Sequence, residues 1–439
     1  MTDPQTAVSE RRRREVLEAL RRGTVPANGL DLLAVGLGRF EPSVSDELQT
    51  VAASGSVFKA VRGEYGAGKT FFSRWLVERA QQAGFAAAEV QISETETPLH
   101  RLETVYRRIT ENLRTAQFPP SALRDVVDGW LYTLESDVLA TGVDPADEQR
   151  LDREVTALLE KRLAGVARTT PAFATGLRGY RSASLSGDVA QAEGLLSWLG
   201  GQPHVAASVR RAAGVRGDLD HFGALGFLQG LLVVLRDSGF SDLVVVLDEV
   251  ETLQRVRGDV RDKALNALRQ LIDEVHAGRF HGLYLIITGT PAFFDGPQGV
   301  QRLAPLAQRL ATDFSTDARF DNPRAIQIRL PGFSHDSLVE VGMRVRDLYA
   351  VGGSDRVPTV VDDAYVSDLA TAVAGRLGGN VGVAPRLFLK KLVADVLDRV
   401  DQFPDFDPRA HYAPTIAGAE MTAAERATAG VDDVALDLP

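Results

Sequence analysis

The chain contains no cysteine among its 439 residues. This absence excludes disulfide bonds, a thiol nucleophile and zinc sites built on cysteine, and it favours a reducing cytoplasm as the location. No apolar run approaches the roughly 18–20 residues that a membrane-spanning helix needs. The first residues also lack the apolar core of a signal peptide. We therefore expect a cytoplasmic protein that does not associate with membranes.

Histidine is scarce, with seven residues, and none of them has the spacing of a metal-ligand pair. Nothing signals a Ser-His-Asp triad. The net charge of −10 argues against a protein coated in nucleic acid, although such a sum does not exclude a local basic face. The composition, 44% apolar and 25% charged, is that of a soluble protein long enough for two or three domains.

The most informative stretch fits the pattern G-x-x-x-x-G-K-[ST] without a mismatch. Its residues are Gly63, Glu64, Tyr65, Gly66, Ala67, Gly68, Lys69 and Thr70. A predicted strand over residues 56–62 precedes it, and a predicted helix over residues 71–83 follows it. In this setting main-chain N–H groups and the helix N-terminus bind a polyphosphate. We expect Lys69 to reach the β- and γ-phosphates, Thr70 to ligate Mg²⁺, and Phe71 to border the same ATP site.

A second nucleotide motif lies far downstream. The apolar run over residues 243–247 predicts a buried parallel strand, and it ends in Asp248 and Glu249. We expect Asp248 to bind the hydration shell of Mg²⁺ and Glu249 to polarise an attacking water. The next predicted strand, residues 283–287, ends near Thr288 and Thr290. Thr290 is the first candidate for a γ-phosphate sensor and Thr288 the second; a hydrogen-bonded turn threonine is the alternative.

One group of apolar residues and two arginines extend this candidate site. Val25, Pro26 and Val35 lie in an apolar stretch before the phosphate loop and are candidates for adenine contacts, with a plain core role as the alternative. The run over residues 32–36 also predicts a short strand.

Two arginines complete the candidates. Arg309, on a helix after the threonine strand, could act as an arginine finger toward a neighbouring subunit, or form a surface salt bridge. Arg386, at a helix start in the C-terminal helical region, could contact the γ-phosphate.

Residues 119–221 predict a helical insertion between the second and third strands. Between residues 161 and 217 there are eight basic residues against two acidic ones, a net charge of +6, with Phe173, Tyr180 and Trp198 interspersed. Cations among aromatic rings suit a nucleic-acid backbone and its exposed bases. A solvated face or a contact between subunits is the alternative. The candidate DNA contacts are Arg168, Arg178, Arg181, Arg210, Arg211 and Arg216.

The predicted fold class is α/β: a P-loop nucleotide-binding domain with a parallel central sheet, a helical insertion and a C-terminal helical lid. The expected division is a basic N-terminal helix over residues 1–22, an ATPase base domain over residues 23–334, and a lid over residues 335–412. Residues 413–439 are acidic and poor in apolar bulk, which predicts a disordered tail.

These motifs together resemble AAA+ ATPases, and the lid arginine of residues 382–386 is similar to that of the origin-recognition and Cdc6-like branch. More narrowly, several short sequence segments resemble those of the ATP-binding proteins of BREX bacteriophage-defence systems, the BrxD-like group. These segments are residues 19–26, 63–70, 247–253, 289–294 and 384–389. The resemblance implies ATP hydrolysis with Mg²⁺, association with DNA, and work beside a helicase or other defence subunits. The stretch after Arg386 is too short for the winged-helix domain of origin-recognition relatives, which leaves the insertion as the candidate DNA-binding region.

Two functional hypotheses follow. The first is an oligomeric AAA+ ATPase that binds double-stranded DNA and uses ATP to load, remodel or signal in defence. The alternative is a nucleotide-gated scaffold that binds ATP, hydrolyses it slowly or never, and controls assembly with a partner protein. Nothing in the sequence resembles the acceptor site that a kinase-like transfer would need.

Overall fold

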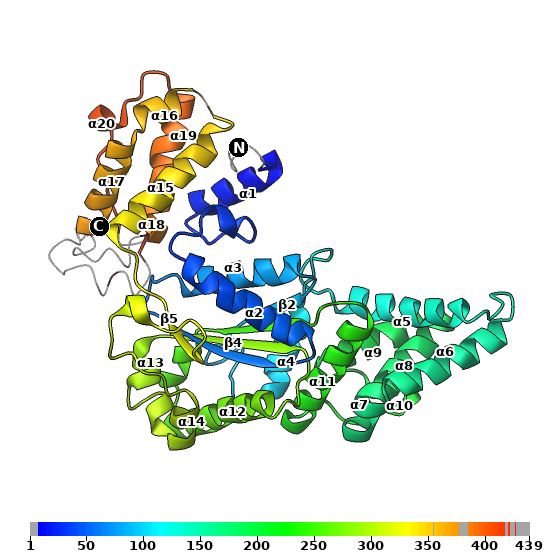
Figure 1. Ribbon diagram of the computed structural model, residues 1–439. Coiled ribbons are helices and arrows are strands. Elements are labelled where there is room, and N and C mark those ends of the chain that lie inside the picture. The colour runs from blue at the N-terminus through cyan, green and yellow to red at the C-terminus, as the bar shows by residue number, and fades with distance from the viewer. Residues whose placement is uncertain (1–7, 354, 377–384, 418–419, 422–425, 427–439) are drawn as a thin grey trace.

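The computed structural model describes residues 8–353, 355–376, 385–417, 420–421 and 426. Its centre is a five-stranded, wholly parallel sheet with the strand order β2-β3-β4-β1-β5 (Figure 1). The strands are β1 Val57–Arg62, β2 Ala86–Gln91, β3 Leu243–Asp248, β4 Leu283–Gly289 and β5 Gln327–Arg329. Together with the helical insertion and the C-terminal helical lid, this sheet confirms the predicted α/β class.

Helices cover both faces of the sheet. The α-helices of this base are α2 Glu41–Ala52, α3 Lys69–Gln82, α4 Leu102–Glu111, α11 His221–Asp237, α12 Gly258–His276, α13 Pro291–Asp295 and α14 Ala304–Arg309. Its 3-10 turns are η2 Leu30–Leu32, η3 Gly38–Phe40, η4 Val250–Gln254, η5 Val300–Arg302 and η6 Ala318–Phe320.

The strand predicted over residues 32–36 is wrong, because this segment is a 3-10 turn followed by irregular chain. Gly36, the last residue of this segment, has a positive φ of 73°, which lies outside the range of an ordinary strand. The apolar residues serve two different cores instead of one sheet face. Leu30 is buried in the base and Leu33 is buried in the lid.

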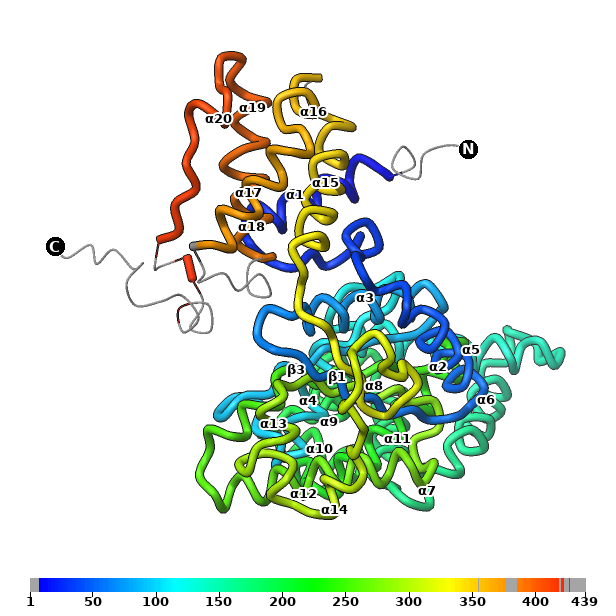
Figure 2. Tube along the Cα trace, turned by 60° about the vertical axis from the view of Figure 1, so that its left-hand side comes forward, coloured from blue at the N-terminus to red at the C-terminus, as the bar shows by residue number. Residues whose placement is uncertain are grey.

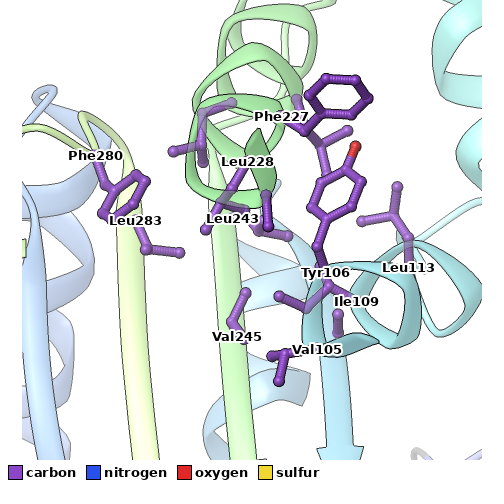
Figure 3. Close-up of a cluster of buried hydrophobic side chains, with 14 of the residues drawn as sticks. Val105, Tyr106, Ile109, Leu113, Phe227, Leu228, Leu243, Val245, Phe280 and Leu283 are labelled. Carbon is purple, nitrogen blue, oxygen red and sulfur yellow. The ribbon is translucent and has the colours of Figure 1, made fainter. Parts of the chain in front are cut away.

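The buried strands alternate between two cores, as side chains of a pleated strand must. On β3, Leu243 and Val245 face the core shared with α4, α11 and α12, whereas Val244 and Val246 face the core formed with α2 and α3. Figure 3 shows the first of these cores, where Tyr106 of α4 and Phe227 of α11 lie over Leu243 and Val245.

The insertion projects from one side of the base, to the right in Figure 1. Its helices are α5 Leu123–Ala140, α6 Glu148–Arg162, α7 Ala164–Thr169, α8 Pro171–Leu185, α9 Val189–Leu199 and α10 Ala207–Ala212. Phe227 makes edge contacts with the rings of Phe173 and Trp198, both at centroid distances of 5.2 Å. The Tyr106 hydroxyl donates to the Leu199 carbonyl at 2.9 Å. The insertion therefore shares one continuous core with the sheet.

The lid lies above the base and includes the N-terminal helix (Figure 2). Its elements are α15 His335–Ala350, α16 Arg356–Val360, α17 Asp363–Arg376, α18 Pro385–Lys390, the π-helical turn η8 Lys391–Leu397, α19 Asp398–Gln402 and α20 Pro408–His411. Helix α1, Glu10–Arg21, buries Val16 and Leu17 in the lid core, and Arg21 donates to both carboxylate oxygens of Asp398 at 2.6 and 2.9 Å. The basic helix is thus a structural part of the lid.

The start of the predicted acidic tail also packs on the lid. Ile416 lies against the lid core and Met421 is buried in it. The rest of that prediction, residues 418–419, 422–425 and 427–439, lies outside the described residues. Within the described part of the chain, no helix is both long and apolar enough to cross a membrane.

The aromatic contacts of Phe227 predict that this side chain holds the insertion to the base. We expect Phe227→Ala to lower the free energy of unfolding by about 3–5 kcal/mol, because it opens a cavity in a closely packed core. Phe222→Ala on the same helix is the matched control, since Phe222 is 79% exposed, and it should change stability by no more than about 0.5 kcal/mol. Urea unfolding followed by circular dichroism measures both. Equal losses would contradict the role given to Phe227.

Candidate nucleotide-binding site

The phosphate loop joins the end of β1 to the start of α3. Gly66 and Gly68 have φ angles of 81° and 86°, which only glycine adopts without strain, and α3 begins directly afterwards at Lys69. Gly63 and Glu64 open the loop, and the Gly63 amide donates to the Gly289 carbonyl at the end of β4. The loop therefore presents the first turn of α3 at the carboxyl edge of the sheet, where parallel α/β folds bind ligands.

The two sequence motifs meet at this edge. The Thr70 hydroxyl donates to Asp248 Oδ2 at 3.0 Å, across 178 positions of sequence. The other oxygen of Asp248 accepts from the buried Thr288 hydroxyl at the end of β4 and from the Glu249 amide at 3.1 Å. Thr288, the second candidate for a sensor, thus fixes the carboxylate of the Asp-Glu pair.

Glu249 has an unusual backbone conformation. Its φ of 60° places it in the left-handed region, which a non-glycine residue seldom adopts and which is found at functional sites. Its carboxylate accepts a hydrogen bond of 3.0 Å from Gln91 Nε2, at the end of β2. Its side chain is thereby held at the edge of the site.

Lys69 lies inside the loop, with its side chain largely buried. Its Nζ donates to the carbonyls of Gly63 at 2.9 Å and Glu64 at 3.2 Å, and it lies 5.1 Å from the centre of the Tyr65 ring. The nearest carboxylate is Glu251, whose Oε1 is 3.8 Å from Nζ. Burial raises the pKa of Glu251, and the charge of Lys69 acts in the opposite direction.

A cavity of about 700 Å³ lies over the loop, within the range of small-molecule sites of about 300–1,000 Å³. Three parts of the chain line it: the phosphate-loop edge of the base, the segment between α1 and α2, and the lid. The residues already predicted for the nucleotide that line it are Val25, Pro26, Val35, Tyr65, Gly66, Ala67, Gly68, Lys69, Thr70, Phe71, Asp248, Glu249 and Arg386. Val25 also packs on the base core and Val35 on the lid core, as the alternative core role expects, and their contact with adenine stays a prediction.

Hydrogen bonds hold the segment between α1 and α2 in place. Arg74 of α3 donates to the Val25 carbonyl at 2.8 Å, and Arg344 of α15 donates to the Ala34 carbonyl at 3.1 Å. The segment is therefore tied to the base at one end and to the lid at the other.

Arg386 lies at the lid side of the cavity and is also bonded to the C-terminal segment. Its guanidinium donates to the Glu420 carbonyl, and the Glu420 carboxylate accepts from Lys390 at 2.8 Å and Lys391 at 2.9 Å. Burial opposes the ionisation of Glu420, yet the two lysine hydrogen bonds lower its pKa to about 2. No sequence pattern connects Glu420 with Arg386.

Two other predicted residues lie away from the cavity. Thr290 is buried at the start of α13 and does not line it. Arg309 forms an ion pair with Asp273 of α12 and donates to the Pro305 carbonyl at 2.6 Å. Within one chain, therefore, neither residue reaches the nucleotide site. The roles of sensor and of finger toward another subunit stay predictions.

Sequence reasoning also missed residues that line the cavity. Glu251, Arg255 and Phe333 do so, and Gln91 contacts Glu249. For Glu251 a signal was present, since it lies two residues beyond the Asp-Glu pair; Phe333 carries none, because its position depends on the packing of the lid.

The insertion does not offer the surface that its charge predicts. Phe173, Tyr180 and Trp198 are all buried, so the interpretation of these rings as stacking surfaces is wrong. Acidic residues just outside residues 161–217 or farther along the chain pair with four of the eight cations. The ion pairs are Arg162 with Asp137 and Asp237, Arg178 with Glu160, Arg181 with Asp152, and Arg210 with Asp218. Of the candidate DNA contacts, Arg168, Arg211 and Arg216 are exposed and form no ion pair with the described residues.

The oxygen atoms that the site offers suit a Mg²⁺ ion bound together with a nucleotide. Thr70 and Asp248 supply a hydroxyl and a carboxylate within hydrogen-bond distance of each other, and hard oxygen ligands are those that Mg²⁺ prefers. Among the described residues no group of three or more His, Asp or Glu side chains could enclose a metal.

The family comparison agrees with this geometry. The family described as "BREX system ATP-binding protein BrxC/D" matches residues 8–416. No curated protein sequence gives a significant match. Among solved structures, the Aeropyrum pernix ORC2 protein in ADPNP and ADP complexes matches with a TM-score of 0.40 and 14% identity, over 82% of this chain and 67% of that one.

The contact between Thr70 and Asp248 predicts a test of the magnesium site. We expect Thr70→Val, which removes the hydroxyl and keeps the shape, to abolish the increase in nucleotide affinity that Mg²⁺ provides, while binding without Mg²⁺ is unchanged. Calorimetric titration with ADP, with and without Mg²⁺, measures both quantities. Thr110→Val is the control, because the Thr110 hydroxyl bonds to a carbonyl in the insertion. An undiminished magnesium effect in Thr70→Val would contradict the assignment.

Proposed function

Because this chain belongs to the BrxC/D family of BREX-system ATP-binding proteins, as its sequence motifs indicated, we propose that it hydrolyses ATP with Mg²⁺. The observation that carries the proposal is the convergence of Thr70, Asp248 and Glu249 beside the phosphate loop. Thr70 and Asp248 would hold Mg²⁺, which when bound would supply positive charge beside the phosphates.

Each side chain then has a role that its position permits. Lys69 and the amides of the loop bind the phosphates, and Arg386 contacts the nucleotide from the lid. Glu249 polarises the attacking water. Val25, Pro26 and Val35 contact the base of the nucleotide through apolar surface.

The alternative is a nucleotide-gated scaffold, and one observation favours it. The hydrogen bond from Gln91 to Glu249 occupies the carboxylate that would accept a proton from water. A chain in which this bond persists would bind ATP and hydrolyse it slowly. Under the leading proposal, Glu249 exchanges this bond for one to the attacking water.

We further propose that the protein associates with double-stranded DNA and with other subunits of the defence system, including further copies of itself. The family supports a role within a multi-component system. For DNA, the exposed cations of the insertion are the support: Arg168, Arg211 and Arg216. Arg309 would serve a neighbouring copy only if the assembly releases it from Asp273.

The role of Glu249 predicts a specific kinetic result. We expect Glu249→Gln to lower ATP turnover by roughly 100-fold or more, because the amide cannot accept the proton, while ATP binding is retained. Phosphate release and calorimetric titration measure the two. The control is Glu154→Gln, an exposed acid on α6. Turnover that survives in Glu249→Gln would remove Glu249 from the mechanism, whereas wild-type protein that binds ATP without hydrolysing it would support the scaffold.

The ion pairs of the insertion predict which arginines bind DNA. We expect Arg168, Arg211 and Arg216 changed together to Gln to reduce the slope of log affinity against log salt by about one for each phosphate that the variant no longer neutralises. The matched control changes Arg162, Arg178 and Arg181, whose cations already have acidic partners. Fluorescence anisotropy with a DNA duplex at several salt concentrations measures the slopes. A similar slope in all three proteins would place any DNA contact elsewhere.

A further inference from the structure

Glu251 is an anomaly within the nucleotide site. It lies on η4, two residues beyond Glu249, and lines the cavity with its side chain only 3% exposed. Neither of its carboxylate oxygens has a hydrogen-bond partner in any other described residue. A buried carboxylate that no neighbouring group hydrogen-bonds is unfavourable, and a native protein that keeps one calls for an explanation.

A structural role does not explain Glu251. A carboxylate that stabilises a fold accepts hydrogen bonds, as Glu78 does from the amides of Gly29 and Leu30 at 2.7 and 2.8 Å. Glu251 accepts none from any other described residue, and its nearest cation, Lys69 Nζ, lies at 3.8 Å, beyond hydrogen-bond distance. Lys69 itself donates to loop carbonyls.

A metal-binding role does not explain it either. Asp248 and Glu249 are its neighbours in sequence, yet the described residues contain no cluster of three acidic or histidine side chains able to hold an ion. What remains is the electrostatic relation between Glu251 and Lys69. A negative charge at 3.8 Å acts on the same ammonium group that a bound polyphosphate needs.

We propose that Glu251 is an affinity-determining counter-charge, which competes with the phosphates of the nucleotide for Lys69 and weakens triphosphate binding more than diphosphate binding. The proposal rests on the nucleotide-binding function proposed above. Lys69 reaches the β- and γ-phosphates, so the charge of the γ-phosphate is the one brought nearest to this pair. Attraction to Lys69 is reduced by Glu251, and the carboxylate also repels the phosphate directly. Both effects grow with the charge that the ligand brings.

As a consequence, the affinities of the site for the triphosphate and for the diphosphate differ less than they would if the phosphate loop acted without Glu251. Because the preference for the triphosphate is weak, the site is not permanently filled by it. The nucleotide that is bound can then change with the cellular ratio of triphosphate to diphosphate. Glu251 is a positioning residue in this account, because it acts through Lys69 and through charge without touching the phosphates.

The test is Glu251→Gln, which keeps the shape and removes the charge. Titration of the full chain with the non-hydrolysable triphosphate AMP-PNP and with ADP, both with Mg²⁺, gives the two dissociation constants. We expect the value for AMP-PNP to fall by about tenfold, and the value for ADP by clearly less, so that the ratio of the two shifts. Glu251→Asp retains the charge and should keep the wild-type ratio. Glu154→Gln, on the exposed side of α6, controls for the loss of one charge anywhere in the chain.

Other outcomes overturn the proposal. Weaker binding of AMP-PNP by Glu251→Gln would mean that the carboxylate supports Lys69, and unchanged constants would mean that it has no electrostatic role. Glu251→Met, of similar length and without charge, must give the same direction, which guards against a local rearrangement in the glutamine variant. If wild-type protein binds neither nucleotide, the proposed function fails. If it binds both and the ratio does not shift, only the role of Glu251 fails.

Discussion

The hydrogen bond between Thr70 and Asp248 is the constraint on which the site depends. Residues 178 positions apart become neighbours because β1 and β3 run parallel and end at the same edge of one sheet, with β4 between them. Thr288 at the end of β4 completes the link by donating to the other oxygen of Asp248. A sheet of this order brings three strand ends to one phosphate loop, and the proposed magnesium site follows from strand order more than from any single residue.

The enclosure of the cavity depends on a different contact, the packing of the N-terminal helix in the lid core. Helix α1 is part of the lid core, and the segment after it is bonded to α3 through Val25 and to α15 through Ala34. A nucleotide in the cavity would contact base, lid and this segment at once. Its binding energy would therefore favour one arrangement of lid on base, which is how ligands shift conformational populations.

Local pattern was enough to predict much of this structure, and long-range packing explains what it missed. The phosphate loop, the Asp-Glu pair and the strands β1, β3 and β4 depend on residues close in sequence, and their predicted positions are correct to within a few residues. The charge of the insertion could not be read in this way, because Asp137 and Asp237, which pair with Arg162, lie outside the residues 161–217 over which the charge was counted. The burial of the aromatic rings could not be predicted from nearby residues either, because Trp198 belongs to a core that includes residues of α4 and α11. Arg309 was located correctly on a helix, but its partner Asp273 comes from another one.

The insertion shares one core with the sheet, and this limits how the insertion can move relative to the base. Helix α11 packs against α5, α7 and α8 of the insertion and against α4, and the chain then passes into β3, which ends at Asp248. An element that shares a closely packed core with the sheet cannot rotate against it without breaking that core. The lid has its own core and meets the base across the cavity. Any large movement driven by the nucleotide is therefore expected between lid and base, with the insertion carried as a rigid extension of the strand that ends at Asp248.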